Sequence, residues 1–79
     1  MPRYFFHVHD RTGTCADEEG MILSDDSAAR RIALKGARSL MSDDIARGVL
    51  DLNGTIAVTD AKGQLILQVR FEEAVLRVC

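Results

Sequence analysis

The chain has 79 residues, enough for one small domain and no more. Its 47% hydrophobic and 28% charged residues are ordinary for a globular protein, and a net charge of −2 argues against a dedicated nucleic-acid-binding protein. No apolar stretch approaches the roughly 20 residues that span a bilayer, and residues 1–7 lack the features of a signal peptide, so we expect a cytoplasmic protein without membrane contact. Cys15 and Cys79 are then expected to be free thiols, and they do not form a CxxC motif.

An aromatic-rich strand is predicted over residues 3–9. Its side chains alternate between two faces, with Tyr4, Phe6 and Val8 on one and Phe5, His7 and His9 on the other. Both faces carry bulky groups, which indicates an inner strand of a sheet. Polar residues 10–14 predict a turn, and a weaker strand over about residues 19–23 is expected to pair back as a hairpin.

A long helix is predicted over about residues 25–47. Ser24 is expected to cap its first N–H groups, and two aspartates in the first turn suit the positive end of the helix dipole. Apolar residues recur at spacings of three and four, namely Ala29, Ile32, Ala33, Ala37, Leu40 and Met41. Gly36 lies on the same side, which suggests close approach to the sheet, and Gly48 is a plausible helix-terminating glycine.

Two further strands are predicted after the helix. Residues 55–59 alternate with β-branched side chains, residues 60–63 fit a tight hairpin loop, and residues 64–71 form the partner strand. In the partner strand we expect Ile66 to face away from Leu65, Leu67 and Val69. The tail, residues 72–79, is apolar enough to form a helical turn or an added edge strand.

This element order predicts a single α+β domain over residues 1–79. Its two layers (ββαββ) consist of one antiparallel sheet of about four strands and one long helix packed across it. The second face of the sheet would lack a cover, and another copy of the chain is the simplest candidate to cover it. We therefore expect a homodimer, with interface residues Phe5, Ile66, Phe71, Val75 and Leu76.

A basic helical stripe supports an alternative function. Arg31, Lys35 and Arg38 fall on one face of the predicted helix and could meet phosphates or an acidic partner. This pattern fits a small nucleic-acid-binding or regulatory protein, and the predicted order strand–strand–helix–strand is similar to that of antitoxin-like regulatory folds. Acidic residues flank the stripe and weaken its field, so an ordinary solvated helix surface also explains it.

Histidine and carboxylate residues supply the remaining candidates for chemistry. His7 and His9 project to the same face of a strand and could reach one metal ion, although two histidines are only half of a tetrahedral site. Hydrogen-bonded strand histidines are the ordinary alternative. The run Asp17-Glu18-Glu19 could in principle support acid–base chemistry, but an exposed loop would leave it a solvated charge run. We find no coherent catalytic constellation and expect neither an enzyme nor a cofactor.

The opening residues Met-Pro-Arg-Tyr-Phe-Phe-His-Val, with the later run Asp17-Glu18-Glu19-Gly20, resemble a family of short, uncharacterised bacterial proteins. Further likeness comes from Leu50-Asp51-Leu52, from Val58-Thr59-Asp60 with Gly63, and from Val69 with Phe71. The resemblance covers nearly the whole chain. It implies a compact stand-alone domain of unknown function, with no established activity, cofactor or catalytic residue. The leading hypothesis is a non-catalytic cytoplasmic protein-interaction module.

Overall fold

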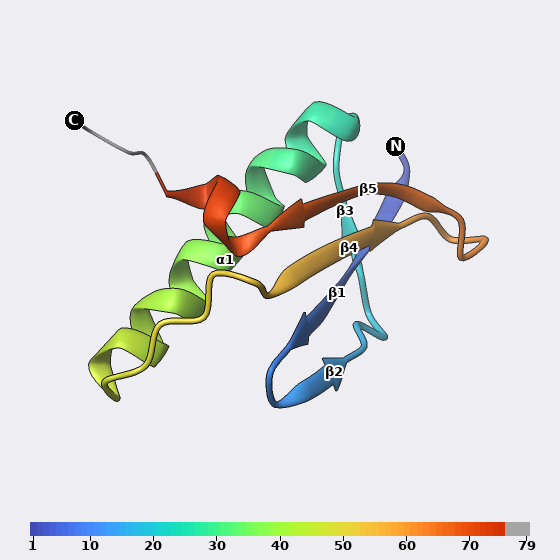
Figure 1. Ribbon diagram of the computed structural model, residues 1–79. Coiled ribbons are helices and arrows are strands. Elements are labelled where there is room, and N and C mark those ends of the chain that lie inside the picture. The colour runs from blue at the N-terminus through green and yellow to red at the C-terminus, as the bar shows by residue number, and fades with distance from the viewer. Residues whose placement is uncertain (76–79) are drawn as a thin grey trace.

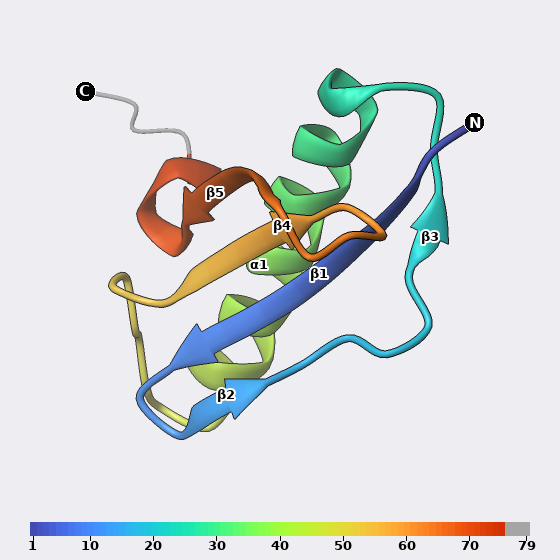
Figure 2. The same ribbon diagram turned by 90° about the vertical axis from the view of Figure 1, so that its right-hand side faces the viewer.

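One antiparallel sheet and one long helix make up the computed structural model, which describes residues 1–75. The elements follow in the order β1 (Arg3–Asp10), β2 (Gly13–Cys15), β3 (Met21–Ile22), α1 (Asp26–Ala46), β4 (Thr55–Thr59), β5 (Leu65–Arg70) and the 3-10 helix η1 (Phe71–Ala74). The strand order is β2-β1-β4-β5, and β3 pairs with the other end of β1. Helix α1 covers one face of the sheet and leaves the opposite face open (Figures 1 and 2). The predicted two-layer α+β fold is confirmed.

The N-terminal hairpin is interrupted rather than continuous. Strand β2 pairs with the end of β1 from Val8 to Asp10, and β3 pairs with Arg3 and Tyr4 at its start. The prediction of one strand over residues 19–23 is therefore only partly right. Between the two pairings, residues 16–20 leave the ladder, because the Asp17 carboxylate accepts the Phe6 N–H at 3.1 Å in place of a strand.

Helix α1 has nearly the predicted bounds but a different cap. Asp25, rather than Ser24, accepts the N–H of Ala28 at 2.8 Å, and Gly48 ends the helix with a φ of +83°. The side chains buried on the sheet side are mostly small: Ala29, Ala33, Ala37 and Met41. Gly36 does not reflect a tight approach, since a Cβ there would meet only Ile56, at an ordinary 3.6 Å. Along residues 1–75, no helix combines the length and apolar composition that crossing a membrane requires.

A β-bulge shifts the side chains at the start of β5. Val58 pairs with Leu67 and Thr59 with Leu65, which makes Ile66 the extra residue. Ile66 consequently packs against the core, while Leu65 is 60% exposed. The predicted placement of Ile66 on the open face is therefore wrong, because strict alternation fails at a bulge.

The core is closed at its C-terminal side by Phe71. This side chain is fully buried, its N–H donates to the Gly54 carbonyl at 2.8 Å, and its ring lies where a Cβ of residue 54 would be. Glycine is required at position 54 by this contact. A residue without exposed surface cannot contribute to a surface interface, so the prediction of Phe71 as an interface residue is wrong.

Candidate interaction surface

An apolar groove lies beside the second half of α1. It holds about 430 Å³ and is lined by Arg38, Met41, Ser42, Ile45, Leu50, Leu52 and Val75, a set that we call the helix-end groove. Three of the apolar side chains around it are about half exposed: Ile45 at 58%, Leu50 at 57% and Val75 at 47%. A cluster of large apolar side chains at the surface is the feature that marks a protein contact site, whereas single exposed ones are ordinary.

One wall of the groove is built by the chain reversal after the helix. Gly48 turns the chain, and Val49 returns to donate its N–H to the carbonyl of Asp44 at 2.9 Å. The buried Asp44 carboxylate accepts from Arg47 at 2.8 Å and from Arg11 at 3.2 Å. The hydrogen bond from Arg47, followed by that from Arg11, lowers the pKa of Asp44 and outweighs the opposing effect of burial. The ion pairs of Asp44 with Arg47 and Arg11 fix the direction in which residues 49–52 leave the helix.

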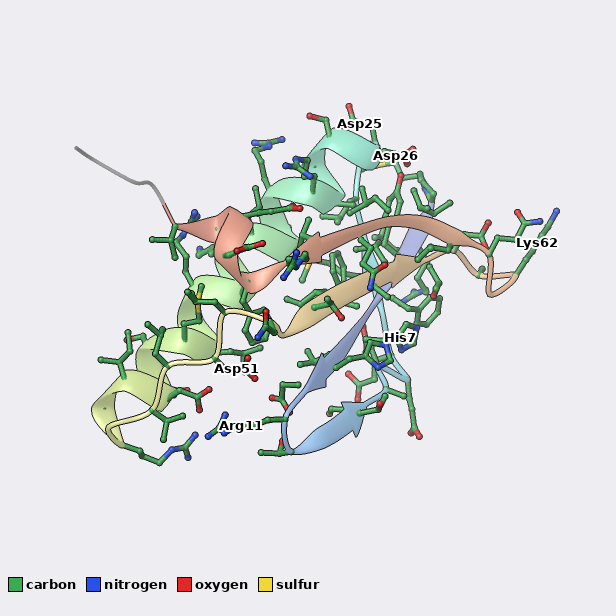
Figure 3. The ribbon with its side chains drawn as sticks, viewed as in Figure 1. His7, Arg11, Asp25, Asp26, Asp51 and Lys62 are labelled. Carbon is green, nitrogen blue, oxygen red and sulfur yellow. The ribbon has the colours of Figure 1, made fainter. Side chains whose placement is uncertain are left out.

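Arg11 connects the Asp44 carboxylate, at the end of α1, to the sheet. It reaches from the β1–β2 turn toward the end of α1, with Asp51 nearby (Figure 3). Its guanidinium pairs with Asp44, and its backbone N–H donates to Asp51 at 3.3 Å. The pairing of Arg11 with Asp44 could not be predicted from sequence patterns, because the two residues lie 33 positions apart.

The opposite wall is formed by η1 and its anchors. Arg38 donates from Nη1 to the Ala74 carbonyl at 3.3 Å, and Arg30 lies 3.9 Å from Glu73. These contacts fasten η1 along α1 and leave Val75 on the groove. The groove is therefore bounded by segments that are each tied to the helix.

The predicted interface residues do not share one surface. Phe5 lies on the open face of the sheet and is partly buried, Ile66 and Phe71 belong to the core side, and Val75 lies on the helix-end groove. Leu76 lies outside the described residues. The open face itself carries polar groups from His7, Thr59 and other strand residues, so it can face water without a cover.

The basic stripe predicted for nucleic acid is only partly available. Arg31, Lys35 and Arg38 are all exposed on α1, as expected. The Arg38 guanidinium, however, is engaged with the Ala74 carbonyl. The nucleic-acid hypothesis stays a prediction.

His7 has both ring nitrogens engaged in hydrogen bonds. Its Nδ1 accepts the N–H of Asp17 at 3.1 Å, so Nε2 carries the proton and donates to Thr59 Oγ1 at 2.9 Å. His9 Nδ1 lies 2.9 Å from Thr14 Oγ1. No group of three or more His, Cys, Asp or Glu side chains suited to a metal ion occurs within residues 1–75. The geometry matches hydrogen-bonded strand histidines.

The run from Asp17 to Gly20 organises the edge of the sheet. Beyond its contact with Phe6, the Asp17 carboxylate accepts the N–H groups of Glu19 and Gly20, each at 3.1 Å. Burial acts to raise the pKa of Asp17, but the three backbone donors, with the nearby His7, hold it below its ordinary value. Gly20 has a φ of +73° and no space for a Cβ beside Phe5. These residues have a structural role that sequence patterns did not reveal.

A polar hollow of about 430 Å³ lies at the end of the open face. Its lining carboxylates are already committed: Asp10 accepts from Thr12, and Asp51 accepts from the backbone of Arg11 and Asn53. Asn53 in turn accepts from Arg70 at 3.1 Å. This arrangement stabilises the loops and does not assemble a nucleophile with a base.

These features define a small α+β domain with one helix on an antiparallel sheet and an apolar groove at the helix end. Residues 3–72 match the family described as Domain of unknown function (DUF6894). The chain belongs to this family, which confirms its resemblance to a domain of unknown function. No curated protein and no solved structure matches the chain. Its function is therefore inferred from its own surfaces.

Proposed function

We propose that the chain is a non-catalytic protein-interaction module that works as a homodimer and holds an apolar segment of a partner protein in the helix-end groove. The observation that carries the proposal is the gathering of Ile45, Leu50 and Val75, each about half exposed, around one groove. Burying such side chains in a contact yields about 25 cal/mol per Å² of apolar surface removed from water. The exposed thiol of Cys15 suits the reducing conditions of the cytoplasm, where we expect the module to work.

The walls of the groove support a binding role. They are fastened by Asp44 on one side and by the contact of Arg38 with Ala74 on the other. A groove with fixed walls loses little conformational freedom on binding, which favours affinity. Arg38 is the cationic residue among those that line the groove. Its Nη1 donates to the Ala74 carbonyl, and its remaining N–H groups would favour a partner segment with a carboxylate beside its apolar residues.

Site-specific photo-crosslinking tests the groove. A photoreactive residue replaces Ile45 in one chain and Ile22 in a matched control, since Ile22 is 51% exposed on β3 and lies outside the groove. In cells that express the protein, we expect a discrete crosslinked product from position 45 only. Adding Leu50→Asp should abolish that product. Equal products from both positions, or a product that survives Leu50→Asp, would contradict the groove assignment.

Native mass spectrometry tests the assembly. We expect a species of twice the 8.7 kDa chain mass, in equilibrium with the monomer as the protein is diluted. A monomer at every accessible concentration would rule out the homodimer while leaving the groove to be judged by crosslinking.

A further inference from the structure

Strand β5 is the unprotected edge of the sheet. Within residues 1–75 it pairs with β4 alone, and Figure 1 shows it at the opposite side of the sheet from β2. An edge strand presents a row of N–H and C=O groups that can pair with another chain. Natural proteins usually blunt such edges with proline, charges, β-bulges or a covering segment. The sequence of β5, Leu-Ile-Leu-Gln-Val-Arg, has no proline and a single charge, on its last residue. Its bulge lies at the start of the strand, at Ile66, and leaves residues 67–70 in regular register with β4.

The hydrogen-bonding direction along β5 follows from the neighbouring strands. Phe6 donates its N–H to Asp17, on the side of β1 away from β4. Phe6 is paired with Val58, so in an antiparallel ladder Val58 directs its own backbone groups away from β1 and toward β5. Val58 is paired with Leu67, whose backbone groups therefore face β4.

Gln68 consequently directs its backbone N–H and C=O outward from the sheet, and Arg70 does the same. The contact at the end of the strand agrees with this alternation. Phe71 donates its N–H inward, to Gly54, and it lies an odd number of positions from Gln68.

The opposite edge of the sheet is divided between two short strands. Strands β2 and β3 cover the two ends of β1, and Asp17 takes the Phe6 N–H between them. Strands β2 and β3 are themselves edge strands, but they are only three and two residues long. β5, with six residues, is the longest edge strand within residues 1–75, so we expect pairing between copies to join β5 to β5. Such an interface is two-fold symmetric and closes after two copies instead of growing into a fibre.

We propose that two copies pair through antiparallel β5 strands, with Gln68 of each copy facing Gln68 of the other on the two-fold axis. This inference rests on the proposed homodimer and supplies its interface. In this register Arg70 lies opposite Ile66, and the two Arg70 residues stand about 14 Å apart at ~3.4 Å per residue. The pairing therefore brings no like charges together, and the side-chain amides of the two Gln68 residues can hydrogen-bond across the axis. A second copy is the occupant that this charge pattern fits, because β5 is complementary to itself.

A proline substitution tests the backbone contact. Gln68→Pro removes an N–H that points away from β4, so the ladder between β4 and β5 stays intact and an edge strand tolerates the ring. We expect Gln68→Pro to abolish the dimer in native mass spectrometry and sedimentation. Gln68→Thr keeps the N–H in a strand-favouring residue and should remain dimeric.

A charge exchange tests the register without relying on proline. Gln68→Lys places two cations against each other at the axis, and Gln68→Glu places two anions there, so each variant alone should raise the dimer Kd at least tenfold. Mixing the two variants should restore a dimer, because opposite charges then face each other. Only self-facing residues give this result.

The outcomes separate this inference from the proposal on which it rests. A wild-type monomer would overturn both the homodimer and the β5 pairing. A wild-type dimer that persists in Gln68→Pro and Gln68→Lys but dissociates in Ile45→Asp would overturn the β5 pairing alone, since the copies would then meet through the helix-end groove. A mixture that forms no more dimer than either charged variant alone would refute the register.

Discussion

The two edges of the sheet are stabilised by different kinds of interaction. At the edge formed on β1, which we call the β1 edge, the short strands β2 and β3 and the Asp17 carboxylate pair with the backbone groups of β1 that point away from β4. At the β5 edge, the strand is held by buried side chains, above all its own Val69 and the following Phe71, while no further strand pairs with its outer side within residues 1–75. The described part of the chain thus closes one edge with polar groups and leaves β5 without a strand partner on its outer side.

This difference affects both stability and association. Hydrogen bonds such as those of Asp17 stabilise the folded chain only modestly, by about 1 kcal/mol net each, but they prevent unwanted strand pairing. A buried apolar side chain such as Phe71 stabilises the folded chain more, but it leaves the backbone groups of the edge strand unpaired. Substitutions at the β5 edge should therefore change the free energy of unfolding most, and those at the β1 edge should change it less.

Removing the anchor of β5 should have the largest effect. Phe71→Ala leaves a cavity beside Gly54 and should lower the free energy of unfolding by about 3–5 kcal/mol. For a chain of this size that is a large share of a total of roughly 4–12 kcal/mol. Urea denaturation followed by circular dichroism measures it. A loss below about 1 kcal/mol would mean that Phe71 does not anchor the strand.

At the β1 edge, Gly20→Ala should have the next largest effect. The residue has a positive φ, and the added Cβ would lie 2.9 Å from side-chain atoms of Arg3 and Phe5. Conformational strain and overpacking together should cost about 2–4 kcal/mol. Gly63→Ala is the control, because Gly63 also has a positive φ, +81°, but nothing lies near its Cβ position. Equal losses in both variants would show that the packing against Phe5 is unimportant.

The carboxylate closure should make stability depend on pH. Folding lowers the pKa of Asp17 below its ordinary 3.8, so the unfolded chain takes up a proton more readily than the folded one. The stabilisation of the folded chain by the ionised Asp17 carboxylate is fully present above pH 3.8. It is lost as the pH falls through the lower pKa that Asp17 has in the folded chain. Asp17→Asn should cost about 1–3 kcal/mol at pH 7 and weaken the dependence on pH.

Urea denaturation at pH 7 and at pH 3 measures this difference. Asp10 and Asp44 also have lowered pKa values, but both are present in wild type and variant, so the difference between the two proteins reports Asp17. Parallel pH profiles would show that the Asp17 carboxylate contributes no linked stability.

The fold was largely predictable from sequence because its signals are local. The β-branched alternation of residues 55–59, the apolar spacing along α1 and the loop ending at Gly63 each depend on neighbouring residues. The bulge at Ile66 was not predictable, because it reflects the register between two strands. The interruption of the N-terminal hairpin by Asp17 also depends on a contact between residues 11 positions apart.

The candidate site was less predictable than the fold. Val75 was predicted for an interface on the uncovered face of the sheet, but it lies on the helix-end groove. Ile45 and Leu50 join it there only because the chain reverses at Gly48. Phe71 carried the same apolar signal as Val75 and is fully buried. Hydrophobicity alone does not distinguish a buried core residue such as Phe71 from an exposed surface residue such as Val75. The difference depends on which other segments of the chain pack against each side chain.

The smallest effect should come from the hydrogen bond that connects the β1-edge closure to β4. Because Asp17 donates its N–H to His7 Nδ1, the ring proton resides on Nε2 and is shared with Thr59. Thr59→Val removes that acceptor and should cost up to about 1 kcal/mol, since water can replace the hydroxyl at a half-exposed position. Thr55→Val, on the same face of β4, is the matched control and should cost less.

Long-range ¹H–¹⁵N correlation spectra identify the tautomer directly. The Nε2–H form should persist in Thr59→Val, because the backbone of Asp17, rather than Thr59, selects it. An Nδ1–H tautomer in the wild type would instead mean that His7 does not accept the N–H of Asp17. The hydrogen bonds of Asp17 would then stop at β1, and His7 would not connect them to Thr59 on β4.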